Sequence, residues 1–337
     1  MRGPYAGPRR VMASSSPTYR PPWWYRGRHL QTLWGPLLRR RRRPALRRER
    51  VETPDGDFID LDWLPGRERG APVIVILHGL EGSARSHYAV GLLSDLEKLG
   101  WRGLVIHFRS CSGEINRSRR MYHSGDTEDL EFVMSGLTSR EPRVRVGLVG
   151  VSLGGNVMLK WLGEWGEHAP AQVAGAVAIS TPFNLAACAS VLDKGLNRRL
   201  YTASFLSTMK SKLDKKAHLY QGVLDLPAAL RAKTFAEYDR FVTAPLSGFA
   251  SERDYWDRSS SAQFLPQIRR PTLLINALND PFMPASALPR AAVTKSQWLE
   301  AAFVRQGGHA GFLEGFAGRR SWAETRALAF LRRHLLG

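Results

Sequence analysis

Cysteine is scarce in this 337-residue chain, which contains only Cys111 and Cys188 and no CxxC pair. Two cysteines exclude a disulfide-rich scaffold, and the missing CxxC spacing excludes the common cysteine-based zinc sites. The sequence has no apolar run near the roughly 18 residues that a membrane-spanning helix requires. It also begins without the apolar stretch of a secretory signal. We therefore expect a soluble, cytoplasmic protein.

Acidic residues are almost absent from the N-terminal part. Residues 1–50 contain fourteen arginines, no lysine and one acid, Glu49, so they carry +13 of the formal net charge of +19. Residues 1–18 are rich in glycine, proline, serine and arginine, and they predict a disordered arm because they cannot bury enough apolar surface to fold. Residues 19–38 contain three tryptophans and several leucines. We expect the Trp- and Arg-rich segment 19–50 to pack on the main domain.

The end of this segment, Arg39 to Arg50, contains eight arginines and one glutamate. We interpret it as a solvated connector, because exposed charge runs usually remain hydrated. The alternative is a docking patch for anionic lipid or nucleic acid. The connector interpretation predicts no obligatory nucleic-acid partner and at most weak, salt-sensitive association with anionic membrane surfaces.

Residues 51–337 show alternating strand and helix patterns. Residues 51–64 predict two antiparallel strands around an Asp-Gly turn. Apolar runs predict further strands at 72–79, 102–108, 144–151, 173–180, 272–278 and 298–307. Helical patterns lie at 87–99, 126–138 with Asp126 as the candidate cap, 152–167 and 322–336. This alternation is typical of an α/β protein with a mostly parallel central sheet and helices on both faces. Residues 183–258 interrupt it as a mostly helical insert.

Gly150, Ser152 and Gly154 form a G-x-S-x-G motif between a predicted buried strand and a predicted helix. A sharp strand-to-helix turn there exposes the serine oxygen above the sheet edge, as in the nucleophile elbow of α/β hydrolases. We therefore predict an α/β-hydrolase fold with Ser152 as the nucleophile. Residues 183–258 then correspond to a helical cap.

A serine nucleophile needs a base and an acid, and this fold orders them after the serine. His309 follows the last strand in a glycine-rich loop, and we predict it to be the general base. His168, His218 and His334 lie in predicted helices or in the insert. Asp280 follows the preceding strand and can accept the N–H of His309. Two weaker acid candidates precede that strand, Asp254 and Asp257.

An oxyanion hole requires two preorganised N–H donors. We predict the backbone N–H groups of Leu153, directly after the nucleophile, and of Leu80, with Glu81 as the fallback. His78 precedes a glycine at a strand end, and we expect it to shape the loop. Cys111 is expected to be a partly buried loop thiol without a catalytic role.

Several polar residues near the same sheet edge, including Asn116 and residues 122–126, either line the pocket or brace a loop, and the sequence does not decide between the two. No cluster in the sequence suggests a metal site, and a serine triad needs no cofactor.

These motifs resemble those of the YheT-like family of α/β hydrolases from about residue 19 to the end. The similar segments are HLQTLWGPLLRR (29–40), HGLEGS (78–83), FRSCSGEINR (108–117), YHSGDTEDL (122–130), GVSLGGN (150–156), TAPLSGF (243–249), DYWDRSS (254–260), INALNDPF (275–282) and GGHAGF (307–312). The resemblance implies a carboxylesterase with the triad Ser152, Asp280 and His309. It also places the chain with the soluble bacterial members rather than the anchored eukaryotic ones. One departure is Ser110, where the family loop usually has glycine.

The sequence therefore predicts a serine carboxylesterase that hydrolyses short- to medium-chain or lipid-like esters through an acyl-enzyme intermediate. One alternative keeps this chemistry but transfers the acyl group to an alcohol. A second alternative is an inactive hydrolase fold tethered to an anionic surface.

Overall fold

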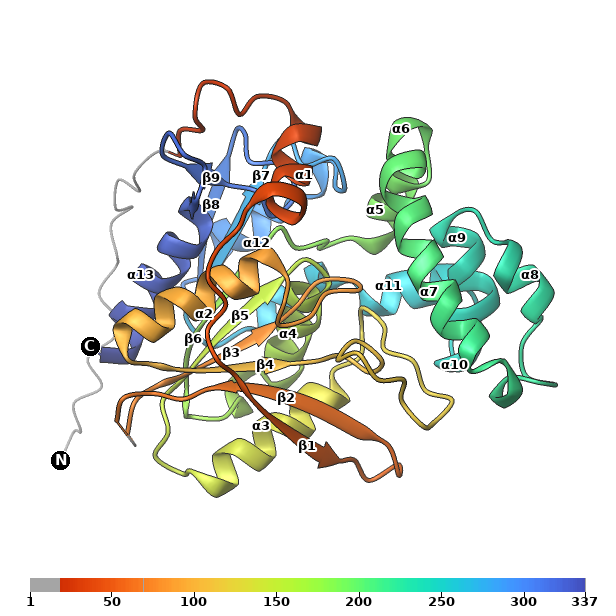
Figure 1. Cartoon of the computed structure of the whole chain (residues 1–337), viewed down its shortest axis with the longest axis horizontal. Coiled ribbons are helices and arrows are strands. Elements are labelled where there is room, and N and C mark those ends of the chain that lie inside the picture. Colours follow the sequence, from red (N-terminus) through yellow and green to blue (C-terminus); the bar gives the residue numbers. More distant parts are fainter. Residues whose placement is uncertain (1–18, 69, 337) are drawn as a thin grey trace.

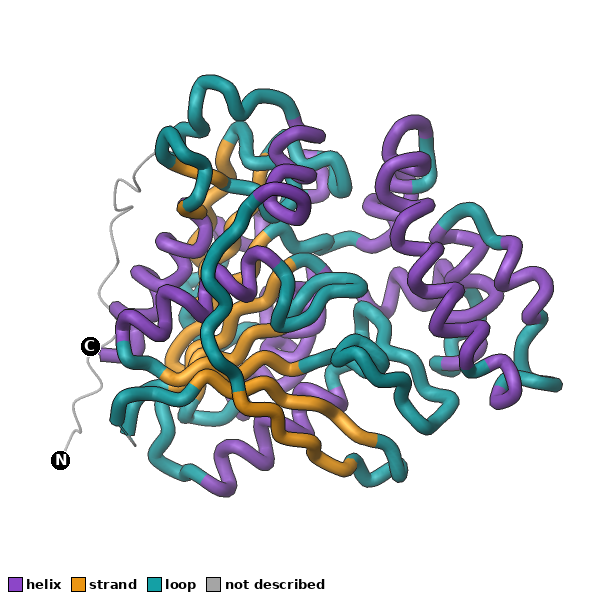
Figure 2. The backbone as a smooth tube through the Cα atoms, viewed as in Figure 1, coloured by secondary structure: helices purple, strands orange, loops and turns teal. Residues whose placement is uncertain are grey.

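An eight-stranded sheet runs through the centre of the molecule, with helices on both faces (Figures 1 and 2). The computed structural model describes residues 19–68 and 70–336, so the predicted arm at 1–18 lies outside the described residues. The strand order is β1-β2-β4-β3-β5-β6-β7-β8. The strands are β1 (Arg47–Glu52), β2 (Phe58–Leu64), β3 (Val73–Leu77), β4 (Arg102–Ile106), β5 (Val146–Val151), β6 (Val173–Ile179), β7 (Thr272–Ala277) and β8 (Leu299–Val304).

Strands β3 to β8 pair in parallel, whereas β1 and β2 form an antiparallel pair at one edge. The predicted mostly parallel sheet and the predicted antiparallel pair are therefore confirmed. Because the parallel strands point the same way, their carboxyl ends lie along one edge of the sheet. The loops that follow these strands meet there, which is where ligands bind in such folds.

Strand β3 shows why the apolar runs are continuous. Val75 and its neighbours at alternate positions pack with helices α3 (Glu128–Arg140) and α4 (Leu153–Trp165). Ile74 and Ile76 face the opposite side, which packs with α2 (His87–Leu99) and α13 (Trp322–Leu336). A parallel strand covered on both faces has no polar face, so its sequence does not alternate.

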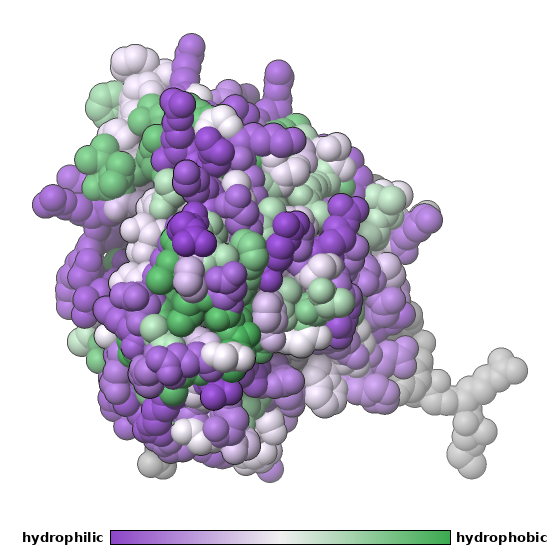
Figure 3. Space-filling model, turned by 90° about the vertical axis from the view of Figure 1, so that its right-hand side faces the viewer, coloured by the Kyte–Doolittle hydropathy of each residue, from purple (hydrophilic) through white to green (hydrophobic). Residues whose placement is uncertain are grey.

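Between β6 and β7 the chain forms only helical elements in its described structure, and they lie to one side of the sheet (Figure 1). They have an apolar cluster of their own that includes Leu213, Tyr220 and Tyr238. On the face that carries this insert, hydrophobic side chains gather near the centre and hydrophilic ones surround them (Figure 3). The elements are α5 (Leu185–Leu192), α6 (Gly195–Asn197), η2 (Arg198–Thr202), α7 (Ala203–Lys215), η3 (Ala217–Leu219), α8 (Leu226–Arg231), α9 (Phe235–Tyr238), η4 (Asp239–Thr243), α10 (Ala244–Leu246), α11 (Glu252–Ser259), η5 (Ser261–Gln263) and η6 (Leu265–Gln267).

The remaining elements are small, apart from one N-terminal helix, α1 (Arg28–Leu38), which lies against the loops after β7 and β8. A short hairpin that the sequence pattern did not predict precedes α13. The other elements are η1 (Gly166–His168), η7 (Ala285–Ala287), α12 (Arg290–Lys295), β9 (Leu313–Glu314) and β10 (Arg320–Ser321). No helix among the described residues is long and apolar enough to cross a membrane.

The predicted start of helix α3 is wrong by two residues. The helix begins at Glu128, and the residue at its N-cap position is Thr127, which makes no side-chain cap bond. Asp126 precedes the N-cap position, and its carboxylate pairs with Arg120.

The interpretation of Arg39–Arg50 as a solvated connector is wrong in part: most of its arginines are exposed, but Arg39 is buried and the end of the stretch is a strand. Its last four residues, 47–50, belong to strand β1, where Arg48 and Arg50 pair directly across from Asp62 and Asp60 of β2. Cross-strand pairs of opposite charge stabilise such a ribbon. Because the acidic partners lie outside the stretch, its own composition did not reveal them.

Arg39 is the most buried of these arginines. Its side chain is fully buried and forms a two-pronged ion pair with Glu324 of α13, which is itself 2% exposed. Its Nε also donates to the carbonyl oxygen of Arg319 at 3.1 Å. Arg41 pairs with Asp95 of α2 at 2.7 Å. These contacts fasten the N-terminal segment to one face of the domain.

We predict that Arg39→Met lowers the free energy of unfolding by about 3–5 kcal/mol, because the buried Glu324 loses its two-pronged partner and keeps the longer, 3.5 Å contact with Arg41. Arg40→Met is the matched control, since Arg40 is exposed; it should leave stability within about 0.5 kcal/mol. Urea unfolding of both variants measures the difference. Equal stabilities would show that the buried pair does not hold the segment.

Candidate active site

Ser152 lies at the turn between β5 and α4 and has a left-handed backbone, with φ 54° and ψ −122°. The turn is tight because the chain passes close to β3. A Cβ added at Gly154 would lie 2.4 Å from the carbonyl oxygen of Leu77. This geometry matches the strand-turn-helix context expected of a nucleophile elbow.

The structure brings together the three residues that the sequence placed in a triad. Ser152 Oγ lies 2.9 Å from His309 Nε2, and His309 Nδ1 lies 2.9 Å from Asp280 Oδ2. The Asp280 side chain is fully buried and that of His309 is 11% exposed. If Nδ1–H donates to the Asp280 carboxylate, Nε2 is the acceptor for the serine hydroxyl proton.

Two further contacts hold the imidazole and the carboxylate in place. The ring of Phe282 stacks on the His309 ring at a centroid distance of 4.0 Å. The N–H of Phe282 donates to Asp280 Oδ1 at 2.8 Å. The weaker acid candidates, Asp254 and Asp257, lie on α11, and neither bonds to His309 within the described structure.

The two predicted oxyanion donors have no protein acceptor among the described residues. The N–H groups of Leu80 and Leu153 are unpaired, whereas the neighbouring Gly79 N–H donates to Tyr88 and the Glu81 N–H donates to the hydroxyl of Tyr122 at 2.9 Å. The fallback donor Glu81 is therefore occupied. Leu80 and Leu153 also line the same cavity as Ser152.

Glu81 itself is held in a left-handed conformation with φ 56°. The Tyr122 hydroxyl donates to its carboxylate at 2.8 Å, and Lys212 Nζ of α7 donates to the same oxygen at 2.8 Å. Tyr122 thus both lines the cavity and braces the loop after β3, two roles that the sequence left open. Lys212 was missed, because nothing in the sequence indicates which residue of the insert reaches this loop.

Cys111 and His78 lie beside the site, and burial favours the uncharged form of both side chains. Burial raises the pKa of the Cys111 thiol to about 11, although Lys212 Nζ lies 3.2 Å from its sulfur. A thiol with this pKa is protonated at neutral pH and is a poor nucleophile. Burial lowers the pKa of His78 to about 3, and its ring bonds to the carbonyl oxygen of Gly79 and the N–H of Phe108. His78 therefore links the loop after β3, which it was expected to shape, with the loop after β4.

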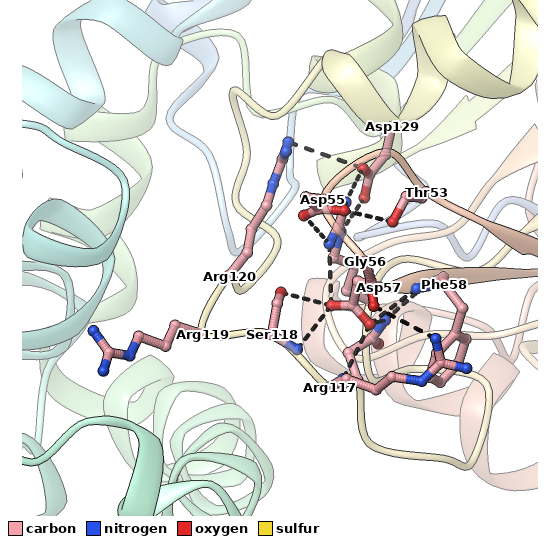
Figure 4. A network of polar contacts seen from close by, with 12 residues as sticks. Thr53, Asp55, Gly56, Asp57, Phe58, Arg117, Ser118, Arg119, Arg120 and Asp129 are labelled. Carbon is pink, nitrogen blue, oxygen red and sulfur yellow. Dashed lines mark hydrogen bonds and ion pairs between the residues drawn. The ribbon is translucent and has the colours of Figure 1, made fainter.

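The loop after β4 is anchored by a buried polar network (Figure 4). Asp57 accepts hydrogen bonds from the Ser118 hydroxyl at 2.6 Å and the Arg117 N–H at 3.0 Å. Arg109 pairs with Asp129 through two bonds of 2.8 Å. Arg119 points away from this network (Figure 4). The loop is thus fixed to β2 and α3 beside the site.

Ser110, where the family usually has glycine, adopts φ 64°. Asn116 supports this backbone: its side-chain oxygen accepts the Ser110 N–H, and its own N–H donates to the Ser110 hydroxyl at 3.1 Å. Asn116 Nδ2 also donates to the carbonyl oxygen of Phe58 at 2.7 Å. Asn116 therefore braces the loop, and paired hydrogen bonds replace the conformational freedom of glycine.

A cavity of about 120 Å³ lies between Ser152 and the helical insert. Most of its wall is apolar and comes from the insert. The lining includes Leu185, Cys188, Leu192, Phe205, Met209, Phe235, Tyr255, Trp256 and Phe282, together with the polar Asp239 and Thr243. Within the described residues no group of three or more His, Cys, Asp or Glu side chains could hold a metal ion. The cavity thus offers an apolar surface beside a hydrogen-bonded serine.

Comparison with known proteins places the chain in a family. The sequence model of the alpha/beta hydrolase fold family matches residues 72–316. The Escherichia coli (strain K12) protein named "Putative esterase YheT" is 37% identical over 327 residues, which cover 96% of this chain and 95% of that protein. The chain is an α/β hydrolase of the YheT-like family.

Two further comparisons agree with this assignment. The human protein named "Phospholipase ABHD3" is 31% identical over 312 residues, covering 90% of the hydrolase and 76% of that protein. The solved structure of the Pyrococcus furiosus esterase Pf2001 superimposes with a TM-score of 0.55 over 86% of the hydrolase and 93% of that chain, at 18% identity. This structure supports the fold alone.

The buried carboxyl group of Asp239, in the cavity wall, makes the stability of the protein depend on pH. Burial raises its pKa from 3.8 to about 7, although it accepts bonds from Thr243 and Trp256. The folded state therefore keeps a proton that the unfolded state releases, so the contribution of Asp239 to stability is lost as pH rises from about 4 to 7. We expect Asp239→Asn to be more favourable, relative to the wild type, at pH 8 than at pH 5. Urea unfolding at both pH values measures this; a difference independent of pH would contradict it.

Proposed function

We propose that the hydrolase is a serine carboxylesterase in which Ser152 is the nucleophile, His309 the general base and Asp280 the acid. The observation that carries this proposal is the continuous hydrogen-bond chain from Ser152 Oγ through the imidazole to the Asp280 carboxylate, with both links at 2.9 Å. Such a chain is the arrangement that activates a serine hydroxyl. Its presence argues against an inactive hydrolase fold.

In the proposed reaction, Ser152 Oγ attacks the ester carbonyl carbon while His309 Nε2 takes the hydroxyl proton. Asp280 stabilises the resulting imidazolium. The carbonyl oxygen becomes an oxyanion, and the free N–H groups of Leu80 and Leu153 are available to stabilise it. Collapse of the tetrahedral intermediate releases the alcohol, which receives the proton from His309.

The acyl group then remains on Ser152 as an ester. Water attacks this acyl-enzyme while His309 takes one of its protons. Collapse of the second tetrahedral intermediate breaks the bond to Ser152 Oγ, which receives that proton from His309, and the carboxylic acid leaves. An alcohol in place of water would give acyl transfer instead. Product analysis with added alcohol distinguishes the two outcomes.

We further propose that the substrates are short- to medium-chain or lipid-like esters and that the helical insert acts as a cap over the site. The apolar wall that the insert contributes supports this, because apolar walls favour hydrocarbon groups. The names of two relatives, an esterase and a phospholipase, also fit an ester substrate.

We predict that Ser152→Ala folds normally but loses at least about 10³-fold in kcat, because only Ser152 can form the acyl-enzyme. It should also lose labelling by a fluorophosphonate probe. The matched control is Ser124→Ala, which changes a serine of the same cavity wall and should retain labelling. The assay uses p-nitrophenyl esters graded by acyl length. A Ser152→Ala enzyme that keeps most of its activity would exclude this nucleophile.

A further inference from the structure

The loop that carries His309 is unusual in its backbone conformation. Gly307, Gly308, Ala310 and Phe312 all have positive φ values, of 147°, 58°, 55° and 45°. Ala310 and Phe312 have side chains, so this conformation costs free energy and persists only where the surroundings impose it. The loop therefore needs external support to hold the imidazole in place.

Helix α1 of the N-terminal segment lies directly against this loop. A Cβ added at Gly311 would lie 2.1 Å from the carbonyl oxygen of Gln31, and one at Gly308 would lie 2.8 Å from the Thr32 hydroxyl. The two glycines of the loop therefore permit a backbone approach that no other residue would allow. Helix α1 lies beside the end of β7 in the fold (Figure 1), although it precedes the matched region 72–316.

Gln31 connects the acid loop with the base loop. Its side chain is completely buried, and its Oε1 accepts hydrogen bonds from Asn279 Nδ2 at 2.8 Å and from the N–H of Gly307 at 3.0 Å. Asn279 directly precedes Asp280, and its own Oδ1 accepts the N–H of Gly308 at 3.1 Å. The Gln31 amide donates to the carbonyl oxygen of Tyr25 at 2.8 Å, which fixes its orientation.

Thr32 contacts the proposed base residue itself. Its Oγ1 accepts the backbone N–H of His309 at 3.0 Å and donates to the carbonyl oxygen of Arg28 at 2.7 Å. Because the hydroxyl proton of Thr32 is donated to the Arg28 carbonyl oxygen, a lone pair of Thr32 Oγ1 is available to accept the His309 N–H. Thr32 and Gln31 together make four hydrogen bonds to the acid and base loops, because the Gln31 amide also donates to Gln306 Oε1 at 3.2 Å.

We propose that Gln31 and Thr32 are positioning residues for hydrolysis: they fix the spacing of the acid and base loops so that His309 reaches Asp280 and Ser152 at once. This inference rests on the proposed function. The N-terminal segment would then help to position the triad, although none of its residues reacts with the substrate.

The test uses two substitutions at one position in the full chain. Thr32→Val keeps the shape but removes the acceptor for the His309 N–H, and Thr32→Ser keeps the acceptor. Because a misplacement of about 1 Å can cost about 10²-fold, we expect Thr32→Val to lower kcat by about tenfold or more with KM changed by less than about twofold. The rate constant for fluorophosphonate labelling should fall in parallel. Thr32→Ser should restore at least half of both rates.

Trp34→Leu is the control for a purely structural effect. Trp34 packs on Trp24 in the same segment, with ring centroids 4.6 Å apart, and makes no side-chain hydrogen bond to the triad loops within the described structure. It should lower the melting temperature without lowering kcat below that temperature. Gln31→Met is measured in the same way, and it decides the question if Thr32→Val fails to fold.

The outcomes separate the two proposals. Failure of the probe to label Ser152 in the wild type would overturn the proposed function. A wild type that is labelled, together with Thr32→Val and Gln31→Met enzymes that keep the wild-type kcat and labelling rate, would overturn the positioning role alone. A loss of kcat in Trp34→Leu equal to that in Thr32→Val would also overturn it, because general loosening of the segment would then explain both.

Discussion

The two hydrogen bonds that join Ser152, His309 and Asp280 connect residues from three separate loops. Each residue follows a different strand, β5, β7 or β8, and the strands β6 and β7 separate β5 from β8 in the sheet. Hydrogen bonds lose strength within a few tenths of an ångström, so these loops must keep their spacing closely. The sheet sets the coarse spacing because both of its faces are covered. The fine spacing depends on contacts made by the loops themselves.

Backbone strain is concentrated at the same edge of the molecule. Among the described residues, the non-glycine positions with positive φ all follow the carboxyl ends of parallel strands. They are Glu81 after β3, Ser110 after β4, Ser152 after β5, Ser180 after β6, and Ala310 and Phe312 after β8. Strained backbone tends to occur where function requires a particular side-chain or N–H direction. Here hydrogen bonds support it, such as those from the Glu81 N–H to the Tyr122 hydroxyl and from the Asn116 N–H to the Ser110 hydroxyl.

The sequence predicted the parts of this structure that depend on local pattern. Buried parallel strands have recognisable apolar runs, and the fixed order of serine, acid and base left few candidates for Asp280 and His309. It did not predict interactions between distant segments. The pairing of Arg39 with Glu324 joins positions 285 apart in the chain, and the bond from His309 to Thr32 spans 277. Local composition contains no information about such partners. The arginine stretch was therefore interpreted as solvated, and Gln31 and Thr32 were given no role beyond their place in the segment that resembles the family. The sequence favoured Leu80 over Glu81 as an oxyanion donor, but it could not show that the Glu81 N–H is bonded to the distant Tyr122 hydroxyl.

An activated aryl carbamate tests most directly whether acyl transfer proceeds through Ser152. Such a compound transfers its carbamoyl group to the nucleophilic serine, and the carbamoyl-enzyme is hydrolysed slowly. Intact-protein mass spectrometry then counts the carbamoyl groups, and peptide mapping locates them. Residual esterase activity is measured on the same samples. We predict one carbamoyl group per chain on Ser152 and a loss of esterase activity in proportion to the carbamoylated fraction. Full esterase activity with Ser152 carbamoylated, or inactivation by an adduct on another residue, would contradict it.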